Sequence, residues 1–364
     1  MKNRFIKIFS VIFVLIITCT LFSGCNYIFD VGKLKQPQNN IIDFRKEKDS
    51  TGNYYLVKKN DNFKVLNLAD IHFGNGAFSK NQDAKVLCDV KKMINSTKPD
   101  LMILTGDNVF SQLISTGNND NLGAYKVLGE FIESFQIPWT LVFGNHDNEP
   151  GTKHSSDEIC DYLESLKFCL FSRGNVSGYG NHIINIRNTS GSLVSSLFLF
   201  DSHIYKGSTQ ISGYDKIHDD QVNWYEENLN RFKKNNDNFT SFAFFHIPFT
   251  EYKEAWKLYR ENSDEVEYYF GWANERNEKI SCPKEKSKLF DKIVELNNTK
   301  GVFCGHNHLN DFSIKYKGVM LTFNSTMDNK AYVKAENEIR GATVLEIKDN
   351  NDFNIYHKKL KDLN

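Results

Sequence analysis

The apolar positions of the chain gather in short runs, rich in β-branched and aromatic residues, that end in polar residues. Such runs are typical of buried strands, and we expect them at residues 65–69, 101–105, 139–143, 183–187, 195–201, 242–245, 302–304, 312–323 and 342–347. Segments with helical character are expected between them, at residues 80–97, 122–135, 155–167, 219–234 and 284–297. This alternation of strands and helices predicts an α/β domain.

Five of the strand-like runs are followed by short polar motifs, in a fixed order along the chain. The motifs are Asp70-Ile71-His72, Gly106-Asp107-Asn108, Gly144-Asn145-His146-Asp147, His246 in Phe-Phe-His-Ile-Pro, and Gly305-His306-Asn307-His308. Because the ends of several strands meet at one edge of a sheet, these side chains can be assembled there into a single rigid site.

The candidate ligands are carboxylates, imidazoles and one amide oxygen, without a cysteine. This donor set suits Fe, Zn or Mn and argues against a closed structural zinc site. In an extended segment Asp70 and His72 point to one face and can reach one ion, and His306 and His308 have the same spacing. Asp107 follows a glycine at a strand end, where a carboxylate can bridge two ions. Two cations about 3.5–4 Å apart can clamp a phosphoryl group and acidify the attacking water, so the pattern predicts hydrolysis of a phosphate ester.

Together the five motifs resemble those of the calcineurin-like metallophosphoesterase family, whose pattern is D-x-H, G-D, G-N-H-[DE], a lone H and G-H-x-H. The resemblance covers roughly residues 63–347. A single block such as G-D carries no information, whereas five blocks in order at strand ends are highly specific. The resemblance implies a four-layer α/β/β/α sandwich with two mixed sheets and a site at one edge of the sandwich.

The resemblance also implies a role for each site residue. Two metal ions, chosen from Fe, Mn and Zn, would be held by Asp70, His72, Asp107 and His308 at the first position and by Asp107, Asn145, His246 and His306 at the second. Asp107 would bridge the two ions. His146 would donate a proton to the leaving group or hold a phosphate oxygen, and Asp147 would orient it.

Within the family the chain is similar to the short purple-acid-phosphatase-like branch. The similar stretches are Gln221-Val222-Asn223-Trp224, Phe245-His246-Ile247-Pro248, Gly305-His306-Asn307-His308 running into Asn310-Asp311-Phe312, and residues 340–346. Phe110 stands where true purple acid phosphatases have their iron-binding tyrosine, so no iron–phenolate bond is expected, and His72 supplies the substitute ligand. The chain also lacks the arginine of the G-D-x-V-D-R-G motif and has Asp147 where Ser/Thr phosphoprotein phosphatases have Glu, which disfavours a protein-phosphatase function.

Charge disfavours a nucleic-acid partner. The formal net charge of the whole chain is zero, and residues 1–25 contain three basic residues and no acidic one. The remaining chain therefore carries 42 basic against 45 acidic residues. Without a basic field there is nothing to attract a polyanion, so no nucleic acid is expected as a partner.

Residues 1–25 have the form of a targeting segment. A basic start precedes an apolar stretch from Ile8 to Phe22, which is short for a membrane span. The ending Ser-Gly-Cys resembles a bacterial lipoprotein signal cleaved before Cys25, although Phe22 stands where leucine is usual. We expect an extracytoplasmic membrane lipoprotein anchored at Cys25. An ordinary signal peptide, giving a secreted protein, and an uncleaved anchor are the alternatives.

The chain is expected to contain a signal peptide at 1–25, a polar tether at 26–60 and a metallophosphoesterase domain at 61–358. Two long segments inside the domain, 111–121 and 250–283, carry no metal motif. The second is dense in aromatic residues, which either form a substrate pocket or simply pack an insertion.

Several single residues have two readings from sequence alone. Cys160 and Cys169 form a disulfide or remain buried thiols. His203 either reaches the rim of the site or packs elsewhere. Asn108 either touches substrate or only shapes the turn, and Glu251 either binds substrate or is a solvated surface charge.

The sequence thus predicts an extracytoplasmic enzyme that hydrolyses small phosphorylated substrates by a metal-activated hydroxide. Monoesters and diesters both remain candidate substrates. One alternative is a phosphodiesterase for nucleotides or lipid headgroups. Another is a non-catalytic surface protein with a vestigial metal site, which would have lost a ligand or His146; the chain has lost neither.

Overall fold

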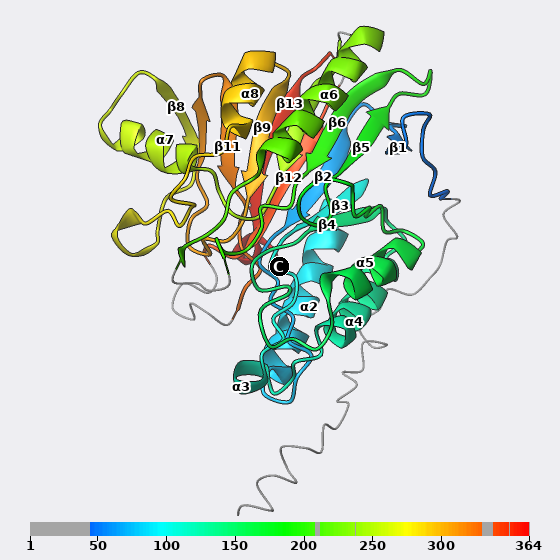
Figure 1. Cartoon of the computed structure of the whole chain (residues 1–364), viewed down its shortest axis with the longest axis vertical. Coiled ribbons are helices and arrows are strands. Elements are labelled where there is room, and N and C mark those ends of the chain that lie inside the picture. Colours follow the sequence, from blue (N-terminus) through cyan, green and yellow to red (C-terminus); the bar gives the residue numbers. More distant parts are fainter. Residues whose placement is uncertain (1–43, 208–211, 237, 330–337, 349, 364) are drawn as a thin grey trace, which may run out of the picture.

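The computed structural model describes residues 44–363 apart from 208–211, 237, 330–337 and 349 (Figure 1). The predicted signal peptide and most of the predicted tether lie outside this range. Within it, none of the helices combines the length and the apolar character that crossing a membrane requires.

Two mixed sheets form the centre of the fold. The larger has the strand order β1-β5-β6-β7-β9-β11-β10-β8 and the smaller β13-β12-β2-β3-β4. The strands are β1 (Tyr54–Val57), β2 (Phe63–Leu68), β3 (Leu101–Thr105), β4 (Trp139–Val142), β5 (His182–Arg187), β6 (Leu193–Leu199), β7 (Thr240–Phe244), β8 (Val266–Phe270), β9 (Thr299–Cys304), β10 (Ser313–Tyr316), β11 (Val319–Phe323), β12 (Gly341–Ile347) and β13 (Phe353–Lys359).

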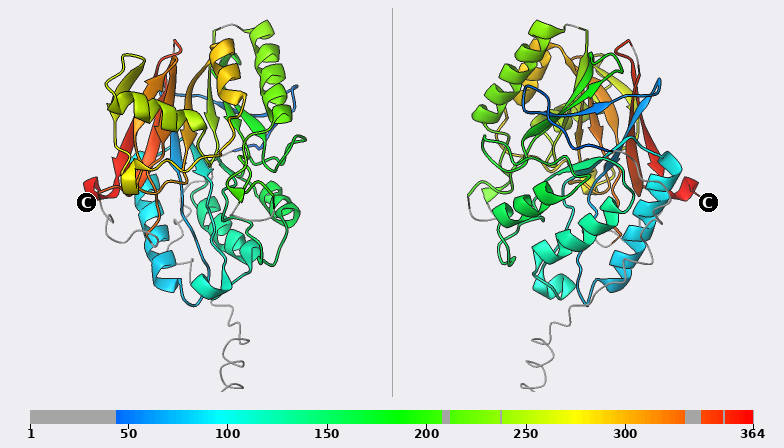
Figure 2. Two further views of the ribbon diagram at one scale, coloured as in Figure 1. Left: turned by 60° about the vertical axis from the view of Figure 1, so that its left-hand side comes forward. Right: turned by 90° about the vertical axis from the view of Figure 1, so that its right-hand side faces the viewer.

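Helices flank the two sheets. They are α2 (Lys80–Thr97), α3 (Leu113–Thr116), α4 (Asn121–Glu133), α5 (Ser156–Ser165), α6 (Asp219–Asn235), α7 (Thr250–Arg260) and α8 (Leu289–Leu296), with short 3₁₀ helices at Arg276–Glu278 and Leu360–Asp362. In Figures 1 and 2, α2, α4 and α5 lie together on one side of the molecule and α6, α7 and α8 on the other.

Alternation along the strands places three apolar layers between these elements. In β3, Leu101 and Ile103 face the other sheet, while Met102 and Leu104 face the helices of their own side. In β9, Phe303 points into the layer between the sheets and its neighbour Val302 points toward the opposite helices. Because successive side chains of a strand point to opposite faces, strands buried on both faces are apolar throughout. The four-layer α/β/β/α sandwich with two mixed sheets is thereby confirmed.

The parallel pairings bring the motif-bearing strands into register. β2, β3 and β4 are parallel neighbours in the smaller sheet. β7 and β9 are parallel neighbours in the larger one. The loops that follow these five strands therefore leave each sheet at the same edge.

The domain begins earlier than the sequence indicated. Residues 54–57, which the sequence places in the tether, form β1, and β1 pairs in parallel with β5 at the edge of the larger sheet. Tyr54 and Leu56 are buried there, whereas Val57 is exposed. Two buried side chains at alternate positions were too weak a pattern to mark a strand. At the other end, β13 continues to Lys359, one residue past the predicted boundary.

Two further elements differ from their predictions. The single strand expected at 312–323 is a hairpin of β10 and β11, turning at Lys317 and Gly318 with φ values of 49° and 82°. Two successive positive φ angles are the requirement of a tight hairpin turn. The helix expected at 284–297 begins only at Leu289.

The aromatic segment 250–283 divides between its two expected roles. Tyr252 and Trp256 of α7 are buried in the layer over the larger sheet, so these aromatics pack the fold. The residues of this segment that line the cleft described below are the polar Glu275, Lys279 and Ser281, not its aromatics. Cys160 and Cys169, the possible disulfide, are free thiols.

His182 of β5 links the two sheets through Thr140 of β4. Its Nδ1 lies 2.7 Å from the carbonyl oxygen of Gly180, and its Nε2 lies 2.7 Å from Thr140 Oγ1. A carbonyl can only accept, so Nδ1 carries the proton and Nε2 accepts from the hydroxyl. Burial lowers the pKa of His182 from 6.5 to about 4.

We expect stability to fall as pH drops from 6.5 toward 4, because the unfolded chain binds a proton at His182 that the folded chain does not. The contribution of His182 is intact above pH 6.5, and about 3 kcal/mol of it is lost near pH 4. The His182→Gln variant cannot titrate and should lose this part of the slope in urea unfolding. An unchanged slope would assign the pH dependence to other groups.

Candidate metal centre

Each candidate ligand follows the end of a strand, and the loops are bonded to one another across the sheets. After β2, Asp70 N donates to the carbonyl oxygen of Gly106 (3.1 Å) and His72 N donates to that of Asp107 (2.9 Å). After β9, Gly305 N donates to the carbonyl oxygen of His246 (3.0 Å), which follows β7. Between the sheets, the backbone N–H of His306 donates to Asp70 Oδ1 (3.0 Å), so the motif loops of both sheets form one framework.

The backbone at the ligand positions is left-handed rather than extended. Asp70, His72, Asp107 and His306 have φ values of 55°, 52°, 49° and 75°. The expectation that Asp70 and His72 lie in an extended segment was therefore wrong. Their side chains converge because each residue turns the chain, and non-glycine residues in this region are uncommon and gather at functional sites.

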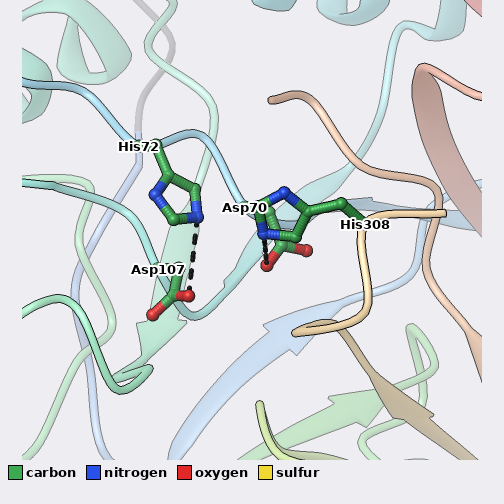
Figure 3. A group of neighbouring side chains, drawn as sticks. All are labelled: Asp70, His72, Asp107 and His308. Atoms are coloured by element: carbon green, nitrogen blue, oxygen red, sulfur yellow. Dashed lines mark ion pairs between the residues drawn. The ribbon is translucent and has the colours of Figure 1, made fainter. Parts of the chain in front are cut away.

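Two clusters of ligand atoms result. Asp70, His72, Asp107 and His308 form the first, drawn in Figure 3, and Asp107, His246 and His306 form the second; within each cluster the ligand atoms lie within 4.8 Å of one another. In the first, His72 Nε2 lies 3.5 Å from Asp107 Oδ2 and His308 Nε2 lies 3.4 Å from Asp70 Oδ1. The clusters contain the two ligand sets inferred from the sequence, Asn145 excepted.

Asp107 belongs to both clusters. Its Oδ2 lies 3.1 Å from His246 Nε2 and 4.0 Å from His146 Nε2, while its Oδ1 accepts from the backbone N–H of His146 (2.8 Å). Burial by itself raises the pKa of Asp107, but the neighbouring charges of His246 and His146 outweigh it and hold the pKa well below its usual range.

Burial keeps two of the imidazoles neutral, which is the form that binds a metal. It lowers the pKa of His72, and together with the charge of His246 it lowers the pKa of His306 to about 3. The pKa of His246 rises to about 9, because the Asp107 charge outweighs the effect of burial.

Buried oxygens of the site lack partners within the described part of the protein. Asp70 Oδ2 and Asn145 Oδ1 are inaccessible and accept no hydrogen bond there. Such an atom costs about 1–3 kcal/mol when nothing satisfies it. Asn145 is held beside Asp107 because its neighbour His146 donates to that carboxylate. Carboxylate, amide and imidazole ligand atoms gathered in one buried place, two of their oxygens without a partner among the described residues, fit two divalent cations.

The structure corrects the expected partner of His146. His146 Nδ1 lies 2.6 Å from Glu149 Oε1, and the other oxygen of Glu149 accepts from Gln112 Nε2. Asp147 is turned away into the loop, where its oxygens accept from the backbone N–H groups of Asn108, Val109 and Gly144 and from Tyr125 OH. Asp147 therefore holds the motif loops together, and Glu149 is the carboxylate that lies beside the His146 ring.

Asp328 is a second carboxylate that the motifs did not indicate. Its Oδ2 lies 3.0 Å from His308 Nδ1, so the Nε2 atom of His308 is turned toward Asp70. A carboxylate behind a ligand histidine fixes the ring orientation and raises its basicity. The signals were present but weak: Glu149 is an acid three residues after His146, and Asp328 follows β11, the neighbour of β9.

Three other polar side chains serve packing or loop structure rather than the two clusters. Glu251 is buried, and its Oε1 lies 3.1 Å from Lys286 Nζ, so its contact is with a lysine of the fold and not with the site. Asn108 is fully buried, and its side-chain amide donates to the carbonyl oxygen of Val142 (3.0 Å). Asp201 accepts from the backbone N–H groups of Tyr179 and His203, so it orders a loop.

A third group of possible ligands, His203, Asp215 and His218, does not make a metal site. The rings of His203 and His218 are stacked, with centroids 4.1 Å apart and planes 19° from parallel. An imidazole binds a metal in the plane of its ring, and two stacked rings cannot both direct such a lone pair at one ion. His203 Nε2 instead lies 2.9 Å from Gln221 Oε1, and His218 Nε2 lies 3.1 Å from Asp215 Oδ2.

A cleft of about 510 Å³ opens over the two clusters. His72, His146 and His306 line its base. Segments next to the smaller sheet contribute Phe78 and Phe110, and segments next to the larger sheet contribute polar side chains, among them Glu275, Lys279 and Ser281. Phe110 meets the ring of His146 edge-on at 5.0 Å, so an apolar ring, not a phenol, borders the centre here.

The family model for calcineurin-like phosphoesterases matches residues 63–310, and the chain belongs to this family. "Probable inactive purple acid phosphatase 28" of Arabidopsis thaliana is 28% identical over 320 residues, which cover 79% of this chain and 75% of that protein. "Phosphatase DCR2" of Saccharomyces cerevisiae is 30% identical over 274 residues, which cover 70% of this chain and 45% of that protein. The solved structure of a dimetal phosphatase from Danio rerio shares the fold, with a TM-score of 0.52 at 8% identity over 82% of this chain and 96% of that one.

The contact between His146 and Glu149 leads to a prediction. We expect Glu149→Gln to slow hydrolysis of esters with poor leaving groups on the order of 10–100-fold, the usual effect of losing a supporting carboxylate, at unchanged metal content. Asp147→Asn is the matched control: it should lower the melting temperature, because the backbone donors of three loop residues lose a charged acceptor. If Asp147→Asn gives the leaving-group effect and Glu149→Gln does not, the partner of His146 is Asp147.

Proposed function

We propose that the protein is a dinuclear-metal phosphoesterase that hydrolyses small phosphate esters outside the cytoplasm. The observation that carries this proposal is the position of Asp107, whose buried carboxylate belongs to both ligand clusters. Seven residues, Asp70, His72, Asp107, Asn145, His246, His306 and His308, would hold the two ions. When bound, the cations would neutralise the phosphoryl charge and lower the pKa of the attacking water.

The surrounding residues have distinct roles in this proposal. The ring of His146 is farther from the shared carboxylate than the rings of His72 and His246, since its Nε2 lies 4.0 Å from Asp107 Oδ2. It would give a proton to the departing oxygen, and Glu149 would hold its ring in the required direction through Nδ1. Asp328 would keep His308 aligned. Phe110, packed against His146, would shield this proton transfer from water.

The complete set of groups supports activity in this chain, although three relatives bear names that call them inactive. A protein with a vestigial centre would have lost a ligand or the proton donor. Here every one of these side chains is present, and the buried oxygens of Asp70 and Asn145 point inward without partners among the described residues.

Metal binding and proton donation should be separable by mutation. Asp107→Asn is expected to weaken both metal positions and abolish turnover, because Asp107 alone is shared between the clusters. His146→Ala should keep two metals per chain and lose on the order of 10²–10⁴ in rate, the worth of a positioned general acid. That loss should shrink for nitrophenyl esters, which need little protonation. Elemental analysis and rates on mono- and diester panels with Mn, Zn or Fe measure both effects.

Two results would contradict these roles. A lost metal in His146→Ala would make His146 a ligand. An equal loss of rate on good and poor leaving groups would make it a clamp for the phosphate rather than an acid. Absence of turnover on every ester, with two metals bound, would leave the protein a metal-binding surface protein.

The location is proposed on the sequence of residues 1–25, whose basic start, apolar stretch and Ser-Gly-Cys ending support a lipid anchor at Cys25. We expect Cys25→Ser to release the protein from membranes in cell fractionation, because the residue that carries the lipid is removed. A Cys25→Ser protein that stays wholly in the detergent phase would point to an uncleaved anchor instead.

A further inference from the structure

Three large apolar side chains are exposed together at one rim of the metal cleft. Phe78 is 62% exposed, Leu113 58% and Ile114 93%. The described residues include only three other large apolar side chains of this exposure, namely Val57, Tyr268 and Tyr269. We call Phe78, Leu113 and Ile114 the apolar lip. It lies on α3 and on the loop before α2, beyond the strand ends (Figure 1).

The lip is held on a rigid backbone, so its exposure is not that of a loose loop. Phe78 N donates to the carbonyl oxygen of Thr116 (3.0 Å), and Asn118 Nδ2 donates to that of Asn75 (3.1 Å). Gln112, the residue before α3, donates through Nε2 to Glu149. A fixed apolar surface of this kind needs an explanation, because exposed apolar side chains that cluster usually mark an interaction site.

The lip leads directly into the metal cleft. Phe78 itself lines the cleft, as do Ser115 and Thr116, the two residues after Ile114. The segments on the other side add Glu275 and Lys279. A molecule bound over the metal clusters would therefore meet apolar side chains on the side of the lip and charged side chains on the opposite side. Such a surface suits an amphiphile, which has an apolar chain and a polar head.

We propose that the apolar lip inserts into a lipid surface and that the substrate is a phosphate ester carried at that surface by an apolar chain. This inference rests on the phosphoesterase function and names its substrate class. A lipid surface is the partner that the sequence supports, because the apolar stretch at residues 8–22 has the form of a membrane-targeting segment. Residues 26–43 can span at most about 60 Å, so an anchored domain stays within reach of the bilayer.

Insertion can be measured without turnover. In the full-length chain on phosphatidylcholine vesicles, brominated acyl chains should quench a tryptophan at Ile114→Trp and leave one at Tyr269→Trp unquenched. Tyr269 is an exposed residue of β8, outside the lip. Equal quenching at the two positions, or none at Ile114→Trp, overturns the proposal. A change in oligomeric state on Leu113→Ser/Ile114→Ser, without quenching, would assign the lip to a second copy of the chain and also overturns it.

Turnover tests the substrate class. The Mn-loaded full-length protein is compared on phosphatidic acid in phosphatidylcholine vesicles and on glycerol 3-phosphate in solution. Leu113→Ser/Ile114→Ser should lower the ratio of the two rates on the order of tenfold or more, because two apolar side chains no longer enter the lipid. Val57→Ser/Tyr269→Ser, which removes two exposed side chains outside the lip, should leave the ratio unchanged.

The outcomes separate this inference from the function on which it rests. An unchanged ratio in the lip variant, or the same change in the control, overturns lipid presentation while the phosphoesterase function stands. Quenching at Ile114→Trp in a protein that hydrolyses no ester would leave lip insertion standing and overturn both the substrate class and the phosphoesterase function.

Discussion

The site depends on the burial of one carboxylate. Asp107 is 1% exposed, yet it lies within 3.1–4.0 Å of imidazole nitrogens from His72, His146 and His246. Two glycines make this approach possible: a Cβ at Gly106 would collide with the ring of His246, and one at Gly144 would collide with Asp107 itself. The glycines of the G-D and G-N-H motifs are therefore steric requirements of the same contact, and the two sheets meet where it forms.

Burying this carboxylate beside others creates an electrostatic problem that the neighbouring groups resolve. Asp70 and Asp107 are both fully enclosed, and the charge of Asp107, added to burial, raises the pKa of Asp147 to about 6. Anions removed from water are stable only near positive charge or dense hydrogen bonding. The histidines supply part of the positive charge that these carboxylates need, and two cations would supply the rest. A fold that concentrates carboxylates in this way is thus organised around the metals it would bind.

Much of this arrangement follows from the sequence, because β-branched runs and the motifs after them report local, short-range requirements. The runs and motifs predicted an α/β domain with one site at the strand ends, whereas the four-layer sandwich and the grouping of Asp107, His246 and His306 came from the resemblance of the motifs to a known family. The errors concern geometry that only the packed chain decides. Asp147 was assigned to His146 by adjacency, but the turn of the loop gives that contact to Glu149. Asp70 and His72 converge through left-handed backbone, which no spacing rule reveals. β1 was missed because its pairing with β5 joins residues about 130 positions apart.

The fold separates the groups that would perform the chemistry from those that would choose the substrate. The ligands leave strand ends that are buried on all sides, so their positions tolerate little change. Phe78 lies in the loop before α2, Ile114 lies on α3 and Lys279 lies in the loop after β8. These residues are not part of a core layer. The two parts are nevertheless joined, since Gln112 at the start of α3 is bonded to Glu149, the partner of His146. Gln112 and Glu149 thus connect the segment that carries the lip with His146, the residue proposed as proton donor.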